Sequence, residues 1–283
     1  MTTAIENMFK DKVLGHPAGL FVLFFTEMWE RFSYYGMRAL LVMFFTASLL
    51  DGGWGWPREH AYAIFGTYTS LVYLSTLLGG YFADKKIGYR YAVVIGALLM
   101  TLGHGAMAVE TPFFIYLGLT LLVFGSGFFK PNMTSIISEM YKGKDEKKDG
   151  AYTIFYMGVN AGAFLGILLC GYLGEQVGWR WGFGLAGIFM LFGLLQFWFA
   201  QNIFGDIGTK PVKVDSNAVE LSPDEPKLNP FTSLQLGLIA IAGILGISWI
   251  FNDPISKISE GAYNLFDFNM FGMEGSNVAI LTA

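Results

Sequence analysis

Six apolar stretches of about 20 residues or more are the feature that most constrains how this chain can fold. They lie at 17–48, 60–83, 89–109, 113–140, 150–174 and 180–203. A helix rises 1.5 Å per residue, so roughly 20 apolar residues cross the roughly 30 Å hydrocarbon core of a bilayer. Only 14% of the residues are charged, against about 25% in soluble domains. The sequence therefore predicts an all-α membrane protein that crosses the lipid bilayer several times.

Composition along the chain predicts four parts. They are a cytoplasmic N-terminus at 1–16, a six-helix transmembrane bundle at 17–204, a polar, proline-rich cytoplasmic linker at 205–233, and a segment at 234–283 that begins with a seventh hydrophobic helix. The seventh apolar run, 234–251, is expected to be shorter than the others and to be followed by a polar segment containing Asp253, Pro254 and Lys257. Because Ile280 and Leu281 suggest another apolar run, we expect a truncated molecule.

Lysine and arginine are distributed unequally between the two sets of loops, and the cytoplasmic side of a membrane protein keeps the larger share. One side has nine of these residues and the other has two. The nine are Lys10, Lys12, Lys85, Lys86, Arg90, Lys142, Lys144, Lys147 and Lys148; the two are Arg58 and Arg180. This bias predicts a multi-pass protein with its N-terminus in the cytoplasm. The expected location is the plasma membrane, most simply the inner membrane of a bacterium.

The first span carries a stripe of ionic and phenolic side chains. Residues three or four positions apart share one face of a helix, and this spacing aligns Glu27, Arg31, Tyr34, Tyr35 and Arg38, with Glu30 at the border. Each charge within the bilayer costs about 2.5–3.5 kcal/mol on insertion scales. The stripe is therefore expected to line a cavity. The alternative is a self-neutralising pair of Glu27 and Arg31, and Arg38 could instead reach toward an interface.

Lys130 lies about two-thirds of the way along the fourth span, directly before Pro131. A proline inside a helix frees a backbone carbonyl, which must then be satisfied away from lipid. We expect Lys130 to face the interior of the bundle. In the alternative interpretation it extends to the cytoplasmic interface as an ordinary residue near a helix end.

Four motifs resemble, in order and spacing, those of the proton-dependent oligopeptide transporters, a branch of the major facilitator superfamily. They are EMWERFSYYG at 27–36, GGYFADKKIGYR at 79–90, FKPN at 129–132 and FYMGVNAG at 155–162. The resemblance covers 17 to about 203. It implies the N-terminal six-helix bundle of such a transporter, followed by part of the segment between its two bundles; the seventh helix would belong to that segment or be a seventh helix of the main fold.

The resemblance also implies functions for individual residues. Glu27 and Glu30 would couple transport to protons, and Asp84, Lys86 and Arg90 would form a gating or structural cluster at the cytoplasmic loop. The residues implied to bind the peptide are Arg31, Tyr34, Tyr35, Tyr73, Lys130 and Asn160. Judged without the motifs, Tyr73 and Asn160 would more often serve helix packing.

The leading hypothesis is proton-coupled symport of di- and tripeptides by the complete parent protein. A non-transporting membrane fragment or assembly partner is the alternative from another class, because the second six-helix bundle is absent from this chain and one bundle cannot form an alternating-access cavity. A symporter of another small anion, such as nitrate, is disfavoured by the intact motif at 27–36. Protons would be the coupling ion, and no other cofactor is expected.

Other classes of function are disfavoured by what the spans lack. They offer no cluster of metal ligands, no nucleophile with a base at useful spacing and no phosphate-binding loop, so no enzyme and no metal site are expected. The lone cysteine, Cys170, can form no disulfide or zinc framework. The small net charge of −4 argues against a nucleic-acid partner.

Overall fold

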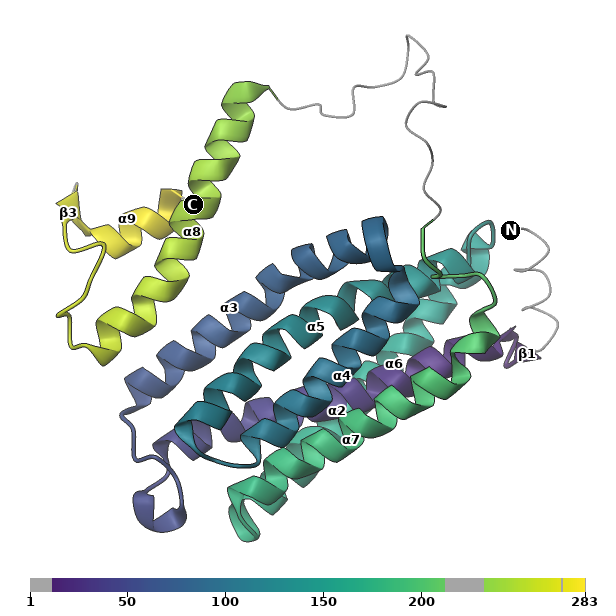
Figure 1. Cartoon of the computed structure of the whole chain (residues 1–283), viewed down its shortest axis with the longest axis horizontal. Helices are drawn as coiled ribbons and strands as arrows, with labels where there is room; N and C mark the ends of the chain where they lie inside the picture. Colours follow the sequence, from purple (N-terminus) through teal and green to yellow (C-terminus); the bar gives the residue numbers. More distant parts are fainter. Residues whose placement is uncertain (1–11, 212–231, 271, 283) are drawn as a thin grey trace. The chain divides into compact units, whose positions relative to one another are not determined.

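Long helices occupy all seven apolar runs in the computed structural model, which describes residues 12–211, 232–270 and 272–282 (Figure 1). The long helices are α2 (Ala18–Thr46), α3 (Arg58–Phe82), α4 (Tyr89–Met107), α5 (Pro112–Met140), α6 (Asp145–Gln176), α7 (Trp179–Ala200) and α8 (Ser233–Ile258). The shorter elements are β1 (Lys12–Val13), β2 (His16–Pro17), η1 (Leu49–Asp51), the π-helical η2 (Ala83–Ile87), η3 (Gln201–Phe204), β3 (Asn269–Met270), β4 (Met273–Glu274) and α9 (Gly275–Thr282). The predictions for 1–11 and for most of the linker, 212–231, lie outside the described residues.

Several helix boundaries follow from local sequence signals. Pro112 opens α5, where its missing N–H costs no hydrogen bond. Gly88 separates η2 from α4 with a φ of 81°, and Gly178 separates α6 from α7 with a φ of 138°. Side chains other than glycine rarely adopt these values. Glycine is therefore required at these two turns.

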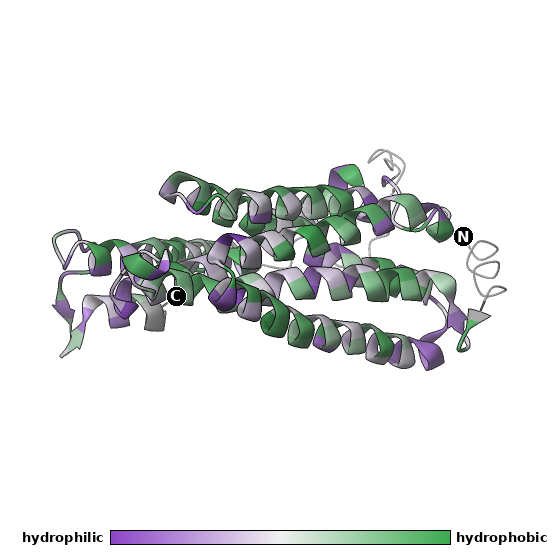
Figure 2. Cartoon of the chain, turned by 90° about the horizontal axis from the view of Figure 1, so that it is seen from below, coloured by the Kyte–Doolittle hydropathy of each residue, from purple (hydrophilic) through white to green (hydrophobic). Residues whose placement is uncertain are grey.

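Within the described residues, six helices are long and apolar enough to cross a membrane: α3 with η2, α4, α5, α6, α7 with η3, and α8. Hydrophobic residues predominate along the described helices (Figure 2). The 29-residue α2 is long enough but is not among the six. Any 18-residue stretch of it contains Glu30, Arg31 and at least one further charge. The predicted all-α membrane fold is confirmed, and the ionic groups of α2 separate this helix from the other six long helices.

The chain divides into two units. The first contains the described residues up to Trp56 and those from Leu71 to Pro211. Within it, α2 packs along α6 and α7, and α4 packs along α5 and α7 (Figure 1). Its core is built from large side chains such as Phe32, Phe44 and Phe183, which are completely or almost completely buried.

The second unit contains Pro57–Ser70, the first part of α3, and the described residues after 231. The Thr67 hydroxyl donates to the Ile250 carbonyl at 3.2 Å, and the Trp249 indole N–H donates to the Ser276 hydroxyl at 3.0 Å. The polar segment expected after 251 is instead the last part of α8, where the ammonium of Lys257 lies 2.9 Å from Asp253. A salt bridge between residues four positions apart stabilises a helix. Pro254 lies near the end of α8, where a proline disrupts few hydrogen bonds of the helix.

Candidate functional site

An ion triad lies on the inward face of α2. The Nε atom of Arg31 is 2.7 Å from Oε1 of Glu27 and 3.1 Å from Oε2 of Glu30. The glutamate side chains are 2% and 0% exposed, and that of Arg31 is 16% exposed. The pairing predicted from the four-residue spacing is present, and Glu30 extends it. The alternative of a self-neutralising pair of Glu27 and Arg31 is therefore incomplete, because Arg31 also contacts Glu30.

This triad is unbalanced in charge and in hydrogen bonding. One guanidinium faces two carboxylates, and neither Oε2 of Glu27 nor either oxygen of Glu30 accepts a hydrogen bond from the described part of the chain. The two buried carboxylates therefore share a single guanidinium partner.

A second cation lies next to the triad on α5. The ammonium of Lys130 is 3.9 Å from the centre of the Tyr34 ring and 5.9 Å from that of the Tyr73 ring. Cation–π contacts of this kind are worth about 2 kcal/mol when they are desolvated. Lys130 thus faces the interior of the bundle, as expected, and does not extend along α5 to the interface.

Tyr34 of α2 contacts Lys130 of α5, and a second cation, on α2 itself, also lies near its ring. The guanidinium carbon of Arg38 lies 5.7 Å from the Tyr34 ring centre, and the Tyr35 ring meets that of Tyr34 edge to face at 5.2 Å. Tyr34 is almost fully buried, whereas Tyr73 is 64% exposed. We call Arg31, Tyr34, Tyr35, Tyr73 and Lys130, with the two glutamates, the polar cluster.

Asn160 is the predicted binding residue that the structure does not join to the polar cluster. It lies on α6 with its side chain exposed. No hydrogen bond of this side chain occurs among the described residues. It stays a prediction from the motif at 155–162.

Three glycines of α6 position the triad, and the sequence analysis did not single them out. A Cβ atom on Gly158 would meet the Phe24 carbonyl oxygen at 2.8 Å, one on Gly166 the Phe32 carbonyl, and one on Gly162 the Met28 carbonyl and the Cβ of Arg31. The two backbones approach this closely because small residues recur every four positions along one helix face. The four-residue spacing of these glycines in the sequence could have predicted this close contact between helices.

The gating or structural function of Asp84, Lys86 and Arg90, at the junction of α3 and α4, stays a prediction. Asp84 and Lys86 are exposed on η2, and no ion pair joins Asp84, Lys86 and Arg90 among the described residues. Arg90 instead donates to the carbonyls of Gln201 and Gly205, each at 2.8 Å. Gln201 begins η3, directly after α7, and Gly205 follows η3. Carbonyls at the end of a helix lack partners within it and carry partial negative charge, which attracts a cation. Arg90 therefore connects the segment that follows α7 to the start of α4.

The polar cluster has the properties of a site for a small zwitterion. Arg31 and Lys130 supply cations suited to a carboxylate, and the tyrosines supply flat apolar area with hydroxyl groups. Two acids within reach of Arg31 compete for the same guanidinium. Occupation by an anion and protonation of a glutamate would therefore influence one another.

Comparison with known proteins places this geometry in context. Residues 90–221 match the model of the POT family. A peptide transporter of Yersinia enterocolitica is 45% identical over 186 residues, which are 65% of this chain and 36% of that protein. A di-/tripeptide transporter of Lactococcus lactis is 37% identical over 246 residues, 85% of this chain and 47% of that protein.

The fold is similar to that of solved transporters. A crystal structure of a mutant of the peptide transporter POT in complex with alafosfalin matches with a TM-score of 0.70 and 37% identity, covering 88% of this chain and 49% of that one. The chain thus spans about half the length, or less, of the relatives it matches.

Proposed function

The chain belongs to the POT family, and from this membership we propose that it supplies the N-terminal half of a transporter that carries di- and tripeptides together with protons. The observation that carries the proposal is the polar cluster, in which Arg31 of α2 pairs with two buried carboxylates and Lys130 of α5 lies over the ring of the buried Tyr34. Relatives described as peptide transporters support the substrate class.

Peptide binding is assigned to the side of the polar cluster that faces α3 and α5. The carboxylate of a peptide would be held by Lys130 and Arg31, and the hydroxyls of Tyr34, Tyr35 and Tyr73 would bond to its amide groups. Asn160 would contact the peptide from α6. Rings that offer area and one hydroxyl tolerate many side chains, which suits a carrier of mixed peptides.

Proton coupling is assigned to Glu27 and Glu30. When a peptide carboxylate takes over part of the guanidinium of Arg31, a glutamate loses its counter-charge and gains a proton. When that proton leaves, the carboxylate recovers Arg31 and weakens the hold on the peptide. This competition couples movement of the proton to movement of the peptide. In the complete transporter, rocking of the two bundles would then carry both across the membrane.

The location follows from the loops. We assign the N-terminus to the cytoplasm, because nine lysines and arginines lie in the loops of that side against two on the other. We assign the protein to the plasma membrane, the bacterial inner membrane, because its similar relatives are bacterial transporters.

The test uses liposomes with the complete transporter, in which this bundle is joined to a second bundle of the kind its relatives have. A labelled dipeptide should accumulate when the interior is alkaline. Glu30→Gln should abolish this accumulation while it spares counterflow exchange, which needs peptide binding but no net proton movement. Glu175→Gln, at the exposed end of α6, is the matched control and should behave as the wild type.

Two outcomes would separate the parts of the proposal. Uptake at the same rate without a proton gradient would refute the coupling assigned to the glutamates. Unchanged dipeptide affinity in Lys130→Gln, measured by equilibrium binding, would refute the site while leaving the family membership intact.

A further inference from the structure

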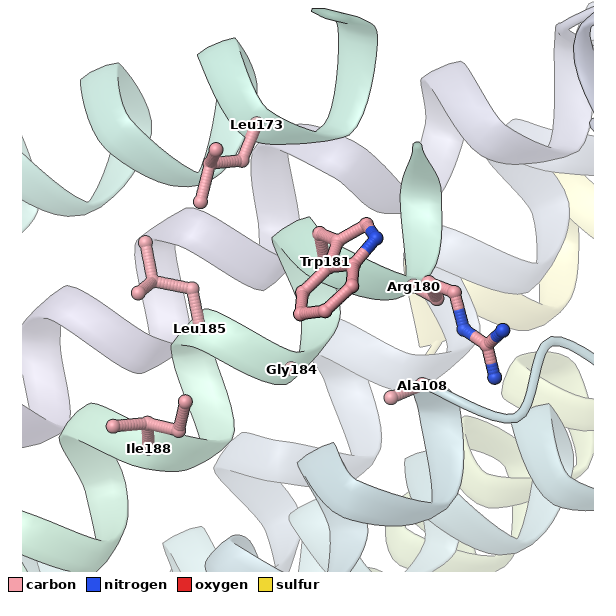
Figure 3. A pocket seen from close by; sticks show the side chains of 7 residues that line it. All are labelled: Ala108, Leu173, Arg180, Trp181, Gly184, Leu185 and Ile188. Carbon is pink, nitrogen blue, oxygen red and sulfur yellow. The ribbon is translucent and has the colours of Figure 1, made fainter. Parts of the chain in front are cut away.

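An apolar groove lies away from the polar cluster, where α7 begins beside the ends of α4 and α6. It has a volume of about 460 Å³, within the roughly 300–1,000 Å³ of ligand pockets. Its lining includes Leu173, Arg180, Trp181, Gly184, Leu185 and Ile188 (Figure 3).

The groove exists because two small residues face each other, Gly184 of α7 and Ala108 directly after α4. A Cβ atom on Gly184 would find only the Cβ of Ala108, at 4.0 Å. Neither residue has a side chain long enough to fill the space between α4 and α7. Glycines elsewhere in the bundle, such as Gly162, allow a neighbouring backbone to approach instead.

The chemistry of the groove divides along its length. Leu185 and Ile188 form an aliphatic part, and Trp181 stands between them and Arg180 (Figure 3). The guanidinium of Arg180 forms no hydrogen bond or ion pair within the described residues, and no acid of that part lies within 4.0 Å of it. The groove therefore has an apolar body and one available cation at its end.

This division matches the depth profile of a bilayer. Arg180 and Trp181 are the second and third residues of α7, at the end of a helix able to span the membrane. Tryptophan is enriched at the interface with the headgroups. Leu185 and Ile188 lie roughly 6–12 Å deeper at 1.5 Å per residue, in the region of the acyl chains.

We propose that this groove binds one anionic phospholipid, with the headgroup phosphate at Arg180, the glycerol region against Trp181, and an acyl chain along Leu185 and Ile188. The fixed cation supplies charge complementarity to a phosphodiester. The aliphatic lining suits a hydrocarbon chain and offers a peptide no hydrogen bonds. The site is independent of the polar cluster and of the transport function proposed above.

Native mass spectrometry of the purified protein tests the proposal with phosphatidylglycerol and phosphatidylcholine as probes. Both lipids offer a phosphodiester to Arg180, but the choline cation of phosphatidylcholine offsets its charge and is repelled by the guanidinium. The wild type should therefore bind phosphatidylglycerol roughly tenfold more tightly than phosphatidylcholine. Arg180→Gln should remove this preference. Arg58→Gln, at the other arginine of the same predicted membrane side, should keep it.

A second variant tests the location without disturbing the packing. Gly184→Leu places a side chain in open space and should weaken binding of both lipids, whereas Gly171→Leu on α6, also in open space, should not. The proposal is overturned if the wild type shows no preference or binds neither lipid. It is also overturned if Arg180→Gln or Gly184→Leu binds as the wild type does, or if inorganic phosphate displaces phosphatidylglycerol at equal concentration.

Discussion

Arg31 holds two buried carboxylates through one nitrogen atom, so its removal leaves two charges without a partner. Breaking a buried ion pair costs about 3–5 kcal/mol. We expect Arg31→Met to lower the free energy of unfolding by roughly 3 kcal/mol, seen as a reduced midpoint of thermal unfolding in detergent. The residue is only 16% exposed, so solvent screens the loss little.

Neutralising the partners should restore part of that loss. In the triple variant Arg31→Met, Glu27→Gln, Glu30→Gln, the amides keep the shape of the carboxylates without their charge. A triple variant no more stable than the single one would show that packing of Arg31, and not its charge, stabilises α2.

His16 gives a second prediction at the scale of single residues. Its Nδ1 lies 2.7 Å from the Tyr141 hydroxyl. Burial, and then the charge of Lys147, lower the pKa of His16 below its usual 6.5. The folded state therefore favours the neutral ring. Its contribution to stability is complete above pH 6.5 and is lost as the pH falls through the lowered folded pKa.

Thermal unfolding between pH 7.5 and 5 measures this effect. His16→Gln should reduce the fall in midpoint toward acid, because the group that takes up the proton on unfolding is gone. His60→Gln, at the start of α3, is the matched histidine variant and should retain the fall of the wild type. Identical pH profiles for wild type and His16→Gln would contradict the conclusion that His16 contributes to the loss of stability toward acid.

At the scale of elements, the contact between α2 and α6 depends on glycines. Gly162→Ala would drive a methyl group into the Met28 carbonyl and the Cβ of Arg31. Overpacking of this kind costs about 1–3 kcal/mol, and it would also displace the ion triad. We expect a lower unfolding midpoint and weaker dipeptide binding.

Gly171→Ala provides the control on the same helix. Nothing lies within 4 Å of a Cβ atom there. Alanine is the better helix former by up to about 1 kcal/mol, so this variant should be as stable as the wild type or more so. Equal effects of the two substitutions would mean that the spacing of the helices is not set by Gly162.

The elements also show which parts of the structure could be predicted from sequence. Hydrophobic length and helical spacing depend on neighbours along the chain, so the runs in α2 to α7 and the pairing of Glu27 with Arg31 were predictable. Contacts between helices depend on tertiary packing. The placement of Lys130 against Tyr34, and the hydrogen bonds from Arg90 to the carbonyls after α7, therefore could not be predicted from the sequence. The resemblance indicated which residues matter but not which atoms they touch.

At the scale of the whole molecule, the two ends of α6 must lie on opposite sides of the membrane. The helix runs 32 residues from Asp145 to Gln176, roughly 48 Å at 1.5 Å per residue, which exceeds the roughly 30 Å hydrocarbon core. Glu146 and Glu175 are exposed near its two ends. They form a matched pair for a test of orientation.

Intact cells with Glu146→Cys or Glu175→Cys can be treated with a membrane-impermeant thiol reagent. Because the lysine-rich loops are predicted to be cytoplasmic, Glu175→Cys should react in intact cells and Glu146→Cys only after permeabilisation. The native Cys170 is buried and should stay unlabelled in both, and Cys170→Ala checks that background. The reverse order of labelling would invert the proposed topology. It would then place the predicted lipid headgroup at Arg180 in the cytoplasmic leaflet, because Arg180 lies beyond the Glu175 end of α6.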